Sequence, residues 1–252
     1  MKYGIQLYSV RDVAKIDFEG ALRQVAEMGY DMVETAGFFG YSADEVNAML
    51  ERYGLTVCST HTGYMAFFHD FDNTVAYHKA IGCKDIILPA APIATKDELE
   101  YTVANINKLL PLVEKEGMKL HFHNHSKEFL PNCDGLIPFD ELAKRTDIRF
   151  ELDTFWAFNA GLDPIEIMEQ YKDRIDFIHL KDGIAVRADD PESKPIGKSV
   201  GSGEAPVEAV RLKAIELGLN VVVESEGLDP TGPEEVKRCI DFLRALDAKD
   251  GN

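Results

Sequence analysis

The stretch KLHFHNHSKEFLPNCDGLIPFDELAKRTDIRFELDT, residues 119–154, decides the fold. It runs from an alternating strand-type segment through a helix-type segment at 139–146 into a second strand-type segment at 148–154. The same order repeats along the whole chain. The strand-type runs are residues 3–10, 30–36, 55–61, 84–90, 119–125, 148–154, 175–182 and 220–227; the helix-type runs are 18–29, 42–54, 72–82, 96–117, 139–146, 163–173, 205–218 and 232–247.

Eight strand–helix units without a Pro-, Gly- or Ser-rich linker favour an α/β fold, a single (β/α)8 TIM barrel over residues 1–252. An open, doubly wound parallel sheet is the alternative. Glycines suited to left-handed helix caps precede several strands: Gly29, Gly54, Gly82, Gly117 and Gly218. The longest irregular segment, 183–204 after the seventh strand, is expected to be a lid, a binding loop or partly disordered.

The formal charge is −17, from 44 acidic and 27 basic residues, so we expect neither nucleic acid nor an anionic membrane as a partner. The widely spaced cysteines (Cys58, Cys83, Cys133 and Cys239) form no CxxC pair and suit reduced thiols in a cytoplasmic protein. An apolar alternation from Tyr3 leaves no room for a signal peptide, and no apolar run is long enough for a membrane span.

Polar side chains collect where the predicted strands end. In a barrel of this kind the carboxyl ends of the strands form the active site, whereas buried parallel strands are otherwise nearly continuous in apolar residues. Converging carboxylates repel one another unless a cation or protons offset their charge, so a divalent metal is the economical explanation. The strand-end residues are Glu34, His61, His123, His125, Glu151, Asp153, His179, Lys181, Glu224 and Glu226.

Alternation along the sixth strand turns Asp153 and Glu151 toward the barrel interior, and Phe150 and Leu152 toward the helices. Glu151 lies deeper, where an unpaired carboxylate is costly, so we expect it to pair with a fifth-strand histidine or with Lys181. A β-bulge that turns Glu151 outward is the alternative.

The stretch 119–129 combines a carboxylate with histidines at alternate positions: His121, His123, His125 and Glu128. A three-histidine zinc site would leave the acids of the sixth and eighth strands unexplained, whereas one histidine with several carboxylates suits a harder ion such as Mn²⁺ or Mg²⁺. We therefore expect Glu128 to be the metal ligand of this stretch. His123 and His125 are expected to contact substrate or support the ligands, and His121 to be a hydrogen-bonded core residue.

Six segments, taken together and in order, resemble the xylose isomerase-like family, which includes sugar phosphate isomerases/epimerases, inosose dehydratase-like proteins and D-tagatose 3-epimerase-like enzymes. They are GIQLYSVR, YDMVETAG, HFHNHSKEF, ELDTFWAFNAGLDP, FIHLKDG and VVVESEG, and they cover nearly the whole chain.

The resemblance implies one divalent metal ion held by Glu128, Asp153, His179 and Glu224. Mn²⁺ is the ion we expect first, and Mg²⁺, Co²⁺ or Zn²⁺ are the alternatives. The resemblance also implies that Glu128 and Glu224 act as catalytic acid and base. One residue departs from many epimerases of the family, because Trp156 stands where they have a histidine. We expect the substrate to meet Glu34, His61, His123, Trp156 and Lys181, and the ligands to be supported by His125, Glu151 and Glu226.

These features predict an isomerase or epimerase that acts through an enediolate on a small keto-sugar or cyclitol. An inosose dehydratase-like or keto-glycoside lyase activity is the alternative. A non-enzymatic sugar-binding or complex subunit is less expected, as is an apurinic-site endonuclease, which needs a basic groove. The expected partner is a small-molecule carbohydrate substrate, and the chain could form a homo-oligomer. The segment PIGKSVGSGE at 195–204 lacks the spacing of a nucleotide phosphate loop, and we expect an unphosphorylated substrate.

Overall fold

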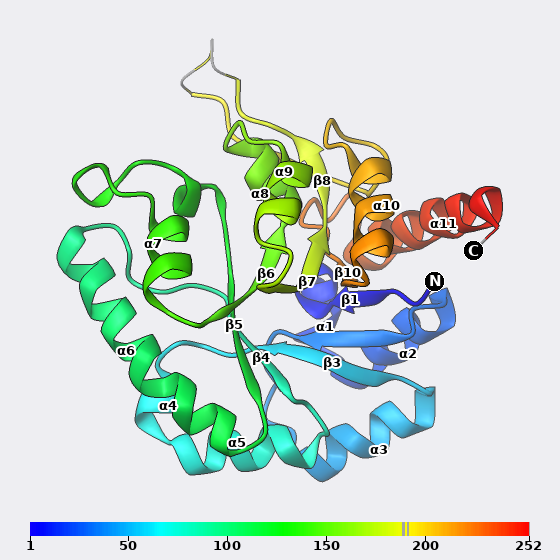
Figure 1. Ribbon diagram of the computed structural model, residues 1–252. Coiled ribbons are helices and arrows are strands. Elements are labelled where there is room, and N and C mark those ends of the chain that lie inside the picture. The colour runs from blue at the N-terminus through cyan, green and yellow to red at the C-terminus, as the bar shows by residue number, and fades with distance from the viewer. Residues whose placement is uncertain (188–189, 191, 252) are drawn as a thin grey trace.

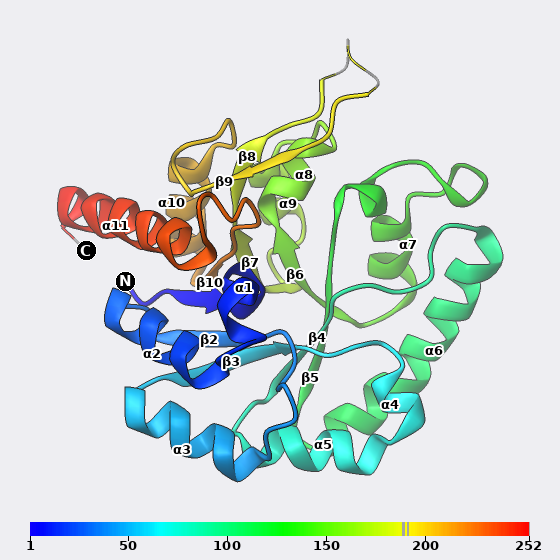
Figure 2. The same ribbon diagram turned by 180° about the vertical axis from the view of Figure 1, so that it is seen from behind.

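The computed structural model describes residues 1–187, 190 and 192–251, apart from the side chain of Cys133. Its centre is a closed parallel barrel in the strand order β1-β10-β7-β6-β5-β4-β3-β2, surrounded by helices (Figures 1 and 2). The predicted (β/α)8 barrel is confirmed, and the open-sheet alternative is wrong. The barrel strands are β1 Gly4–Gln6, β2 Met32–Thr35, β3 Thr56–His61, β4 Asp85–Leu88, β5 Lys119–His123, β6 Arg149–Asp153, β7 Ile175–Leu180 and β10 Asn220–Val223.

The helices connect successive strands and cover the outside of the barrel. Short 3₁₀ turns, η1 (Leu7–Val10), η2 (Ser126–Phe129) and η3 (Cys133–Gly135), interrupt some of the connections. The α-helices are α1 Arg11–Ala14, α2 Phe18–Met28, α3 Ala43–Tyr53, α4 Ala66–His69, α5 Phe71–Ala80, α6 Lys96–Lys115, α7 Pro138–Arg145, α8 Thr154–Asn159, α9 Pro164–Gln170, α10 Val207–Leu217 and α11 Gly232–Asp250.

Local sequence signals set the ends of these helices. Ser42 and Thr95 begin α3 and α6, each with a glutamate three residues later that completes a capping box. The five glycines predicted at helix-to-strand returns all have positive φ, between 67° and 97°.

The core fills the space between the barrel and its helices. Phe150 of β6 stacks on Phe139 of α7 with ring centroids 4.4 Å apart, as the outward register predicts. β6 has a register shift relative to β7 at Phe150/Glu151, yet Glu151 still faces inward and is fully buried. The bulge is present, but the predicted inward direction is confirmed by the contacts of Glu151 described below.

The segment after β7 is more regular than expected. Two strands, β8 (Asp182–Ile184) and β9 (Ile196–Lys198), form an antiparallel hairpin that projects from the barrel in Figure 1. The expectation of an irregular segment over 183–204 is therefore wrong at 183–184 and 196–198, while residues 188, 189 and 191 lie outside the described residues.

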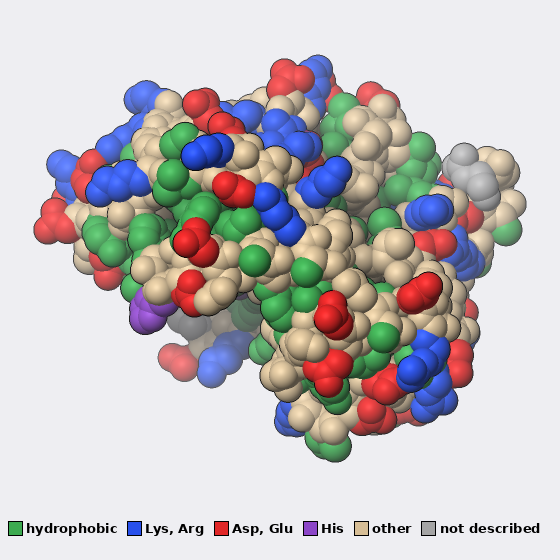
Figure 3. Space-filling view, turned by 90° about the horizontal axis from the view of Figure 1, so that it is seen from below, with side chains coloured by type: hydrophobic (Ala, Val, Ile, Leu, Met, Phe, Trp, Pro, Cys, Tyr) green, Lys and Arg blue, Asp and Glu red, His purple; other side chains and the backbone are tan. Residues whose placement is uncertain are grey.

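The charged surface and the free cysteine thiols agree with the composition of the chain. Acidic and basic side chains are interspersed on the face shown in Figure 3. Cys58, Cys83 and Cys239 carry free thiols; the side chain of Cys133 lies outside the described residues. No helix in the described part of the chain combines the length and apolar character needed to cross a bilayer.

Candidate active site

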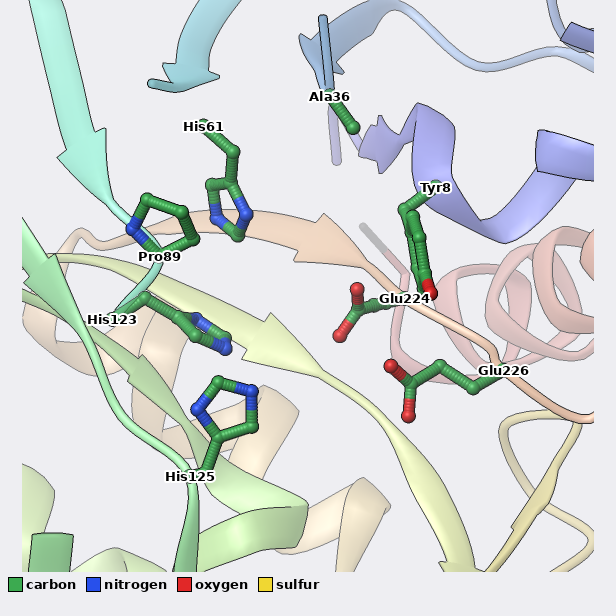
Figure 4. Close-up of a pocket in the computed structure, with 8 residues that line it drawn as sticks. All are labelled: Tyr8, Ala36, His61, Pro89, His123, His125, Glu224 and Glu226. Carbon is green, nitrogen blue, oxygen red and sulfur yellow. The ribbon is translucent and has the colours of Figure 1, made fainter. Parts of the chain in front are cut away.

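A cavity of about 350 Å³ opens at the carboxyl ends of the barrel strands. In Figure 4, His123 and His125 from the end of β5 lie across this cavity from Glu224 and Glu226, which follow β10. The residues that line it are Tyr8, Ala36, His61, Pro89, His123, His125, Glu224 and Glu226.

Four side chains at one end of this cavity are arranged to hold a metal ion. Each of them offers one ligand atom, and these four atoms all lie within 4.8 Å of one another. Oδ2 of Asp153 and Nδ1 of His179 are buried and have no hydrogen-bond partner among the described residues, although Nδ1 lies 3.3 Å from Oε2 of Glu224. Buried polar atoms without hydrogen-bond partners are uncommon, and two such atoms that face each other are suited to bind a cation. The four residues are His123, Asp153, His179 and Glu224.

Glu128, predicted as a metal ligand and catalytic group, does not belong to this group. It lies in the 3₁₀ turn η2, where its Oε2 accepts the backbone N–H of His125. The fully buried side chain is thereby folded onto its own turn, and burial raises its pKa. The structure groups His123, and not Glu128, with Asp153, His179 and Glu224. The role of Glu128 as a metal ligand stays a prediction, since its Oε1 is buried and has no hydrogen-bond partner among the described residues.

A layer of carboxylates lies beneath the four candidate ligands and contacts their imidazoles. Oε2 of Glu151 lies 2.8 Å from Nε2 of His61 and 3.2 Å from both Nδ1 of His123 and Nε2 of His179. Oε1 of Glu34 lies 2.7 Å from the same Nε2 of His179. The predicted pairing of Glu151 with a fifth-strand histidine is confirmed, whereas its predicted alternative partner Lys181 lies elsewhere.

This lower layer determines which imidazole nitrogens face the cavity. An ionised carboxylate only accepts hydrogen bonds, so Nε2 of His179 and Nδ1 of His123 carry the protons that they donate downward. The other nitrogen of each ring is then the one available to the upper group, and in His179, whose pKa is raised, it must first lose a proton. The lower group (His61, His123, Glu151 and His179) could also hold an ion by distance alone, but ions in both places would need doubly deprotonated imidazoles.

Burial and neighbouring charges set the protonation of the two layers. Burial alone would raise the pKa of Glu151, but His179, His123 and His61 lower it well below its ordinary value. Burial alone would lower the pKa of His179, and the surrounding glutamates raise it well above its ordinary value. Burial raises the pKa of Asp153 to about 7 and lowers that of His123 to about 3.

Glu34, predicted to contact substrate, lies below the cavity. It is fully buried, and it accepts hydrogen bonds from Nε2 of Gln6 (2.6 Å) and Oγ of Ser59 (2.5 Å). Its role is to position His179 and His61, since its Oε1 is also 3.2 Å from Nε2 of His61. Glu34 thus pairs with His61 and does not line the cavity, and its contact with substrate stays a prediction.

Lys181 contacts the two glutamates that line one side of the cavity. Its ammonium group is almost fully buried and lies 3.1 Å from Oε2 of Glu224 and 2.7 Å from Oε2 of Glu226. It also lies 4.7 Å from the centre of the Trp156 ring, a cation–π distance. Lys181 and Trp156 are thus not among the lining residues, and their contact with substrate stays a prediction.

His61, His123, His125 and Glu226 reach the cavity directly. His125, expected to contact substrate or to support the ligands, lines the cavity beside His123, and burial lowers its pKa to about 4. The histidine is therefore a neutral imidazole at neutral pH.

Several functional residues were missed from the sequence. Tyr8 lines the cavity, and Gln6 and Ser59 hold Glu34. The alternation that places Ser59 on the same strand face as His61 carries this signal, as does the step from Gln6 to Tyr8 in the first strand. Ala36 and Pro89 also line the cavity, but nothing in the sequence marks these two residues as functional.

The family model described as xylose isomerase-like TIM barrel matches residues 22–246. The chain belongs to the xylose isomerase-like TIM barrel family. An inosose dehydratase from Geobacillus kaustophilus (strain HTA426) is 27% identical over 188 residues, which are 64% of this chain and only 60% of that protein. An inosose dehydratase from Mesomycoplasma hyopneumoniae (strain 7448) is 24% identical over 92% of this chain and 89% of that protein.

The fold of this xylose isomerase-like chain is shared over nearly its whole length by a solved structure. A sugar phosphate isomerase/epimerase from Parabacteroides distasonis ATCC 8503 superposes with a TM-score of 0.81 and 25% identity, over 97% of this chain and 93% of that one. The relatives of this xylose isomerase-like chain thus include proteins named for elimination and for isomerisation.

Proposed function

We propose that the protein is a divalent-metal-dependent enzyme that removes a proton next to the carbonyl of an unphosphorylated sugar or cyclitol, as an isomerase or epimerase. The observation that carries this proposal is the pair of buried, unpartnered atoms, Oδ2 of Asp153 and Nδ1 of His179, facing Glu224 at the cavity. His123, Asp153, His179 and Glu224 would hold the ion.

The donor set bears on the choice of ion. With His123 in place of Glu128, two imidazoles and two carboxylates would bind the metal, a mixture that fits Mn²⁺, Co²⁺ or Zn²⁺ better than Mg²⁺. When bound, such an ion supplies Lewis acidity that stabilises negative charge on the substrate carbonyl oxygen.

The side chains around the cavity would carry out the proton transfer. Glu224, whose pKa is lowered well below its ordinary value by Lys181 and His179 despite its burial, is ionised and can accept a proton. His125, on the opposite side and neutral, can accept or return one. The buried ammonium of Lys181 would offset charge that develops on a substrate oxygen.

Dehydration is the second candidate. Epimerisation by two carboxylates on opposite sides of the sugar is not supported here, because Glu128 is absent from the cavity and imidazoles face Glu224 and Glu226 (Figure 4). A carboxylate on one side with an imidazole on the other suits removal of a proton and loss of a neighbouring hydroxyl. Two relatives are named inosose dehydratase, which also favours this outcome.

The backbone amides of the loop after β7 are already hydrogen-bonded within the protein, which supports an unphosphorylated substrate. The carboxylate of Asp182 accepts backbone N–H groups of Gly183, Gly201, Gly203 and Ala205 at 2.8–3.1 Å. These are the amides that a phosphate would need in this loop, and the protein's own carboxylate already occupies them.

The test is nuclear magnetic resonance in D₂O with purified protein supplied with Mn²⁺, Co²⁺ or Zn²⁺ and a panel of keto-sugars and inososes. Deuterium incorporated next to a carbonyl, with a new stereoisomer or aldose–ketose pair, supports the first candidate. A new unsaturated product supports dehydration. Stoichiometric metal with no exchange on any compound would instead favour a sugar-binding protein, and an Asp153→Asn variant controls for contaminating activity.

A further inference from the structure

A second cavity of about 270 Å³ adjoins the first at the mouth of the barrel. The two cavities share Tyr8 and Ala36 as lining residues, so they meet across these side chains. Each is close to the lower end of the size range of small-molecule sites, about 300–1,000 Å³. A ligand of two linked rings could therefore occupy both, whereas one ring fills only one.

The walls of the second cavity are mainly apolar and aromatic. Leu7, Phe39 and Leu228 contribute to them, and the rings of Tyr8 and Phe39 are 45% and 46% exposed. Large aromatic side chains left open to solvent at the rim of a cavity suit contact with the apolar face of a ring.

The backbone is strained at two of these positions. Phe39 and Leu228 both have φ of 52°, in the left-handed region that bulky side chains rarely adopt. Such conformations persist where the surroundings impose them, often at ligand sites. Phe39 is held by its ring contact with the buried Phe18, at a centroid distance of 5.2 Å.

The shared residue Tyr8 is also fixed in place. The Arg11 guanidinium lies 4.2 Å from the centre of the Tyr8 ring, and its N–H groups donate to the backbone oxygens of Tyr8 and Glu226. These contacts engage Arg11 in positioning Tyr8. Asp12 and Lys15, which have opposite charges, also line the cavity. The other lining residues are apolar or aromatic, which suits the face of an uncharged ring.

We infer that the second cavity binds an uncharged ring with an apolar face, glycosidically linked to the sugar that reacts in the first cavity. This inference rests on the proposed function, because the reacting sugar is taken to lie beside His123 and Glu224. The outer ring can be a second sugar or an aromatic aglycone, since both present an apolar face to Tyr8 and Phe39.

The test is titration calorimetry with three probes: methyl β-D-glucopyranoside, 4-nitrophenyl β-D-glucopyranoside and cellobiose. The wild-type protein should bind one or both two-ring probes at least about tenfold more tightly than the methyl glycoside, as burial of one ring face implies. A preference for the nitrophenyl compound identifies an aromatic aglycone, and a preference for cellobiose identifies a second sugar.

Phe39→Asn removes the ring while keeping a residue that tolerates positive φ. It should abolish most of the two-ring gain and leave the affinity for the methyl glycoside unchanged. Tyr101→Asn, on the exposed face of α6, is the matched control and should keep the gain. Leu228→Gly, which relieves the strained φ, is the second variant if Phe39→Asn does not fold.

Equal affinities for all three probes on the wild-type protein would overturn this inference alone and leave the proposed function standing. A two-ring gain that survives both Phe39→Asn and Leu228→Gly would also overturn it. Absence of binding by every probe would count against both the second cavity and the proposed sugar site.

Discussion

Nε2 of His179 lies 2.7 Å from Oε1 of Glu34, and this contact decides which side of the imidazole faces the cavity. The carboxylate accepts the Nε2–H, so Nδ1, which faces Asp153 and Glu224, is the nitrogen that would lose its proton to bind a metal ion. The buried carboxylates below the cavity thereby orient the imidazole of His179 toward the other candidate metal ligands.

Removing His123 tests the corrected ligand set. His123→Ala should lower the affinity for Mn²⁺ by more than about 100-fold, beyond the 10–100-fold effect typical of residues that only orient ligands. Glu128→Gln should leave the affinity unchanged, because Glu128 caps the turn at His125. Calorimetric titration of both purified variants measures the difference, and the reverse order of effects would restore Glu128 as the ligand.

Glu151→Gln keeps the shape of the lower layer and removes its charge. Glu151 contacts the imidazoles of His61, His123 and His179, so we expect metal affinity to fall by about 10–100-fold with the fold intact. Circular dichroism and metal titration check the two parts. Full metal affinity together with full turnover would show that Glu151 does not position the site.

Metal affinity should rise with pH. Burial raises the pKa of Asp153 to about 7, and the pKa of His179 is well above its ordinary value, because the neighbouring glutamates outweigh burial. Both groups therefore hold protons at low pH that a metal ion must displace. Affinities measured at pH 6, 7 and 8 in buffers of different protonation enthalpy should increase and reveal proton release; affinity that is flat or falls with pH contradicts this reading.

At the opposite end of the barrel, Asp176 stabilises the fold. It accepts hydrogen bonds from the Nε and Nη2 groups of Arg149 and lies 3.0 Å from Nε2 of His121. Asp176→Asn should lower the free energy of unfolding at pH 7 by about 1.5–3 kcal/mol, as for hydrogen bonds to a charged group. Denaturation by urea measures this, with the exposed Asp241→Asn as the control.

The effect of Asp176 should also depend on pH. Burial alone would raise its pKa, but His121 and Arg149 lower it well below the ordinary value of about 3.9. The stabilisation is therefore complete above about pH 4 and is lost as the pH falls further. A difference between wild type and Asp176→Asn that grows on acidification would refute this account.

The barrel could be predicted because its signals are local and repeated. Alternating strands and glycines such as Gly54, with φ of 67°, each act within a few residues. The inward direction of Glu151 could also be predicted from alternation, and it survives the register shift beside it. The role of His121 as a hydrogen-bonded core residue is confirmed by its contact with Asp176.

The ligand from the fifth strand could not be predicted from spacing. Glu128 and His123 are both close to the end of β5, and spacing alone does not reveal that Oε2 of Glu128 accepts the backbone N–H of His125 while His123 lies beside Asp153, His179 and Glu224. Glu34 was placed in contact with substrate because strand position alone does not reveal how deeply Gln6 and Ser59 draw a side chain into the barrel.

The mutual hydrogen bonding of the lower layer limits how this barrel can diverge. Replacing Glu34 or Glu151 by an apolar residue would strand several buried donors at once, and replacing His179 would strand two carboxylates. A single apolar substitution in this layer is therefore costly, because it leaves several buried groups without partners. New chemistry is more accessible through the outer residues, such as Tyr8, Phe39 and His125, which can each change without affecting the others.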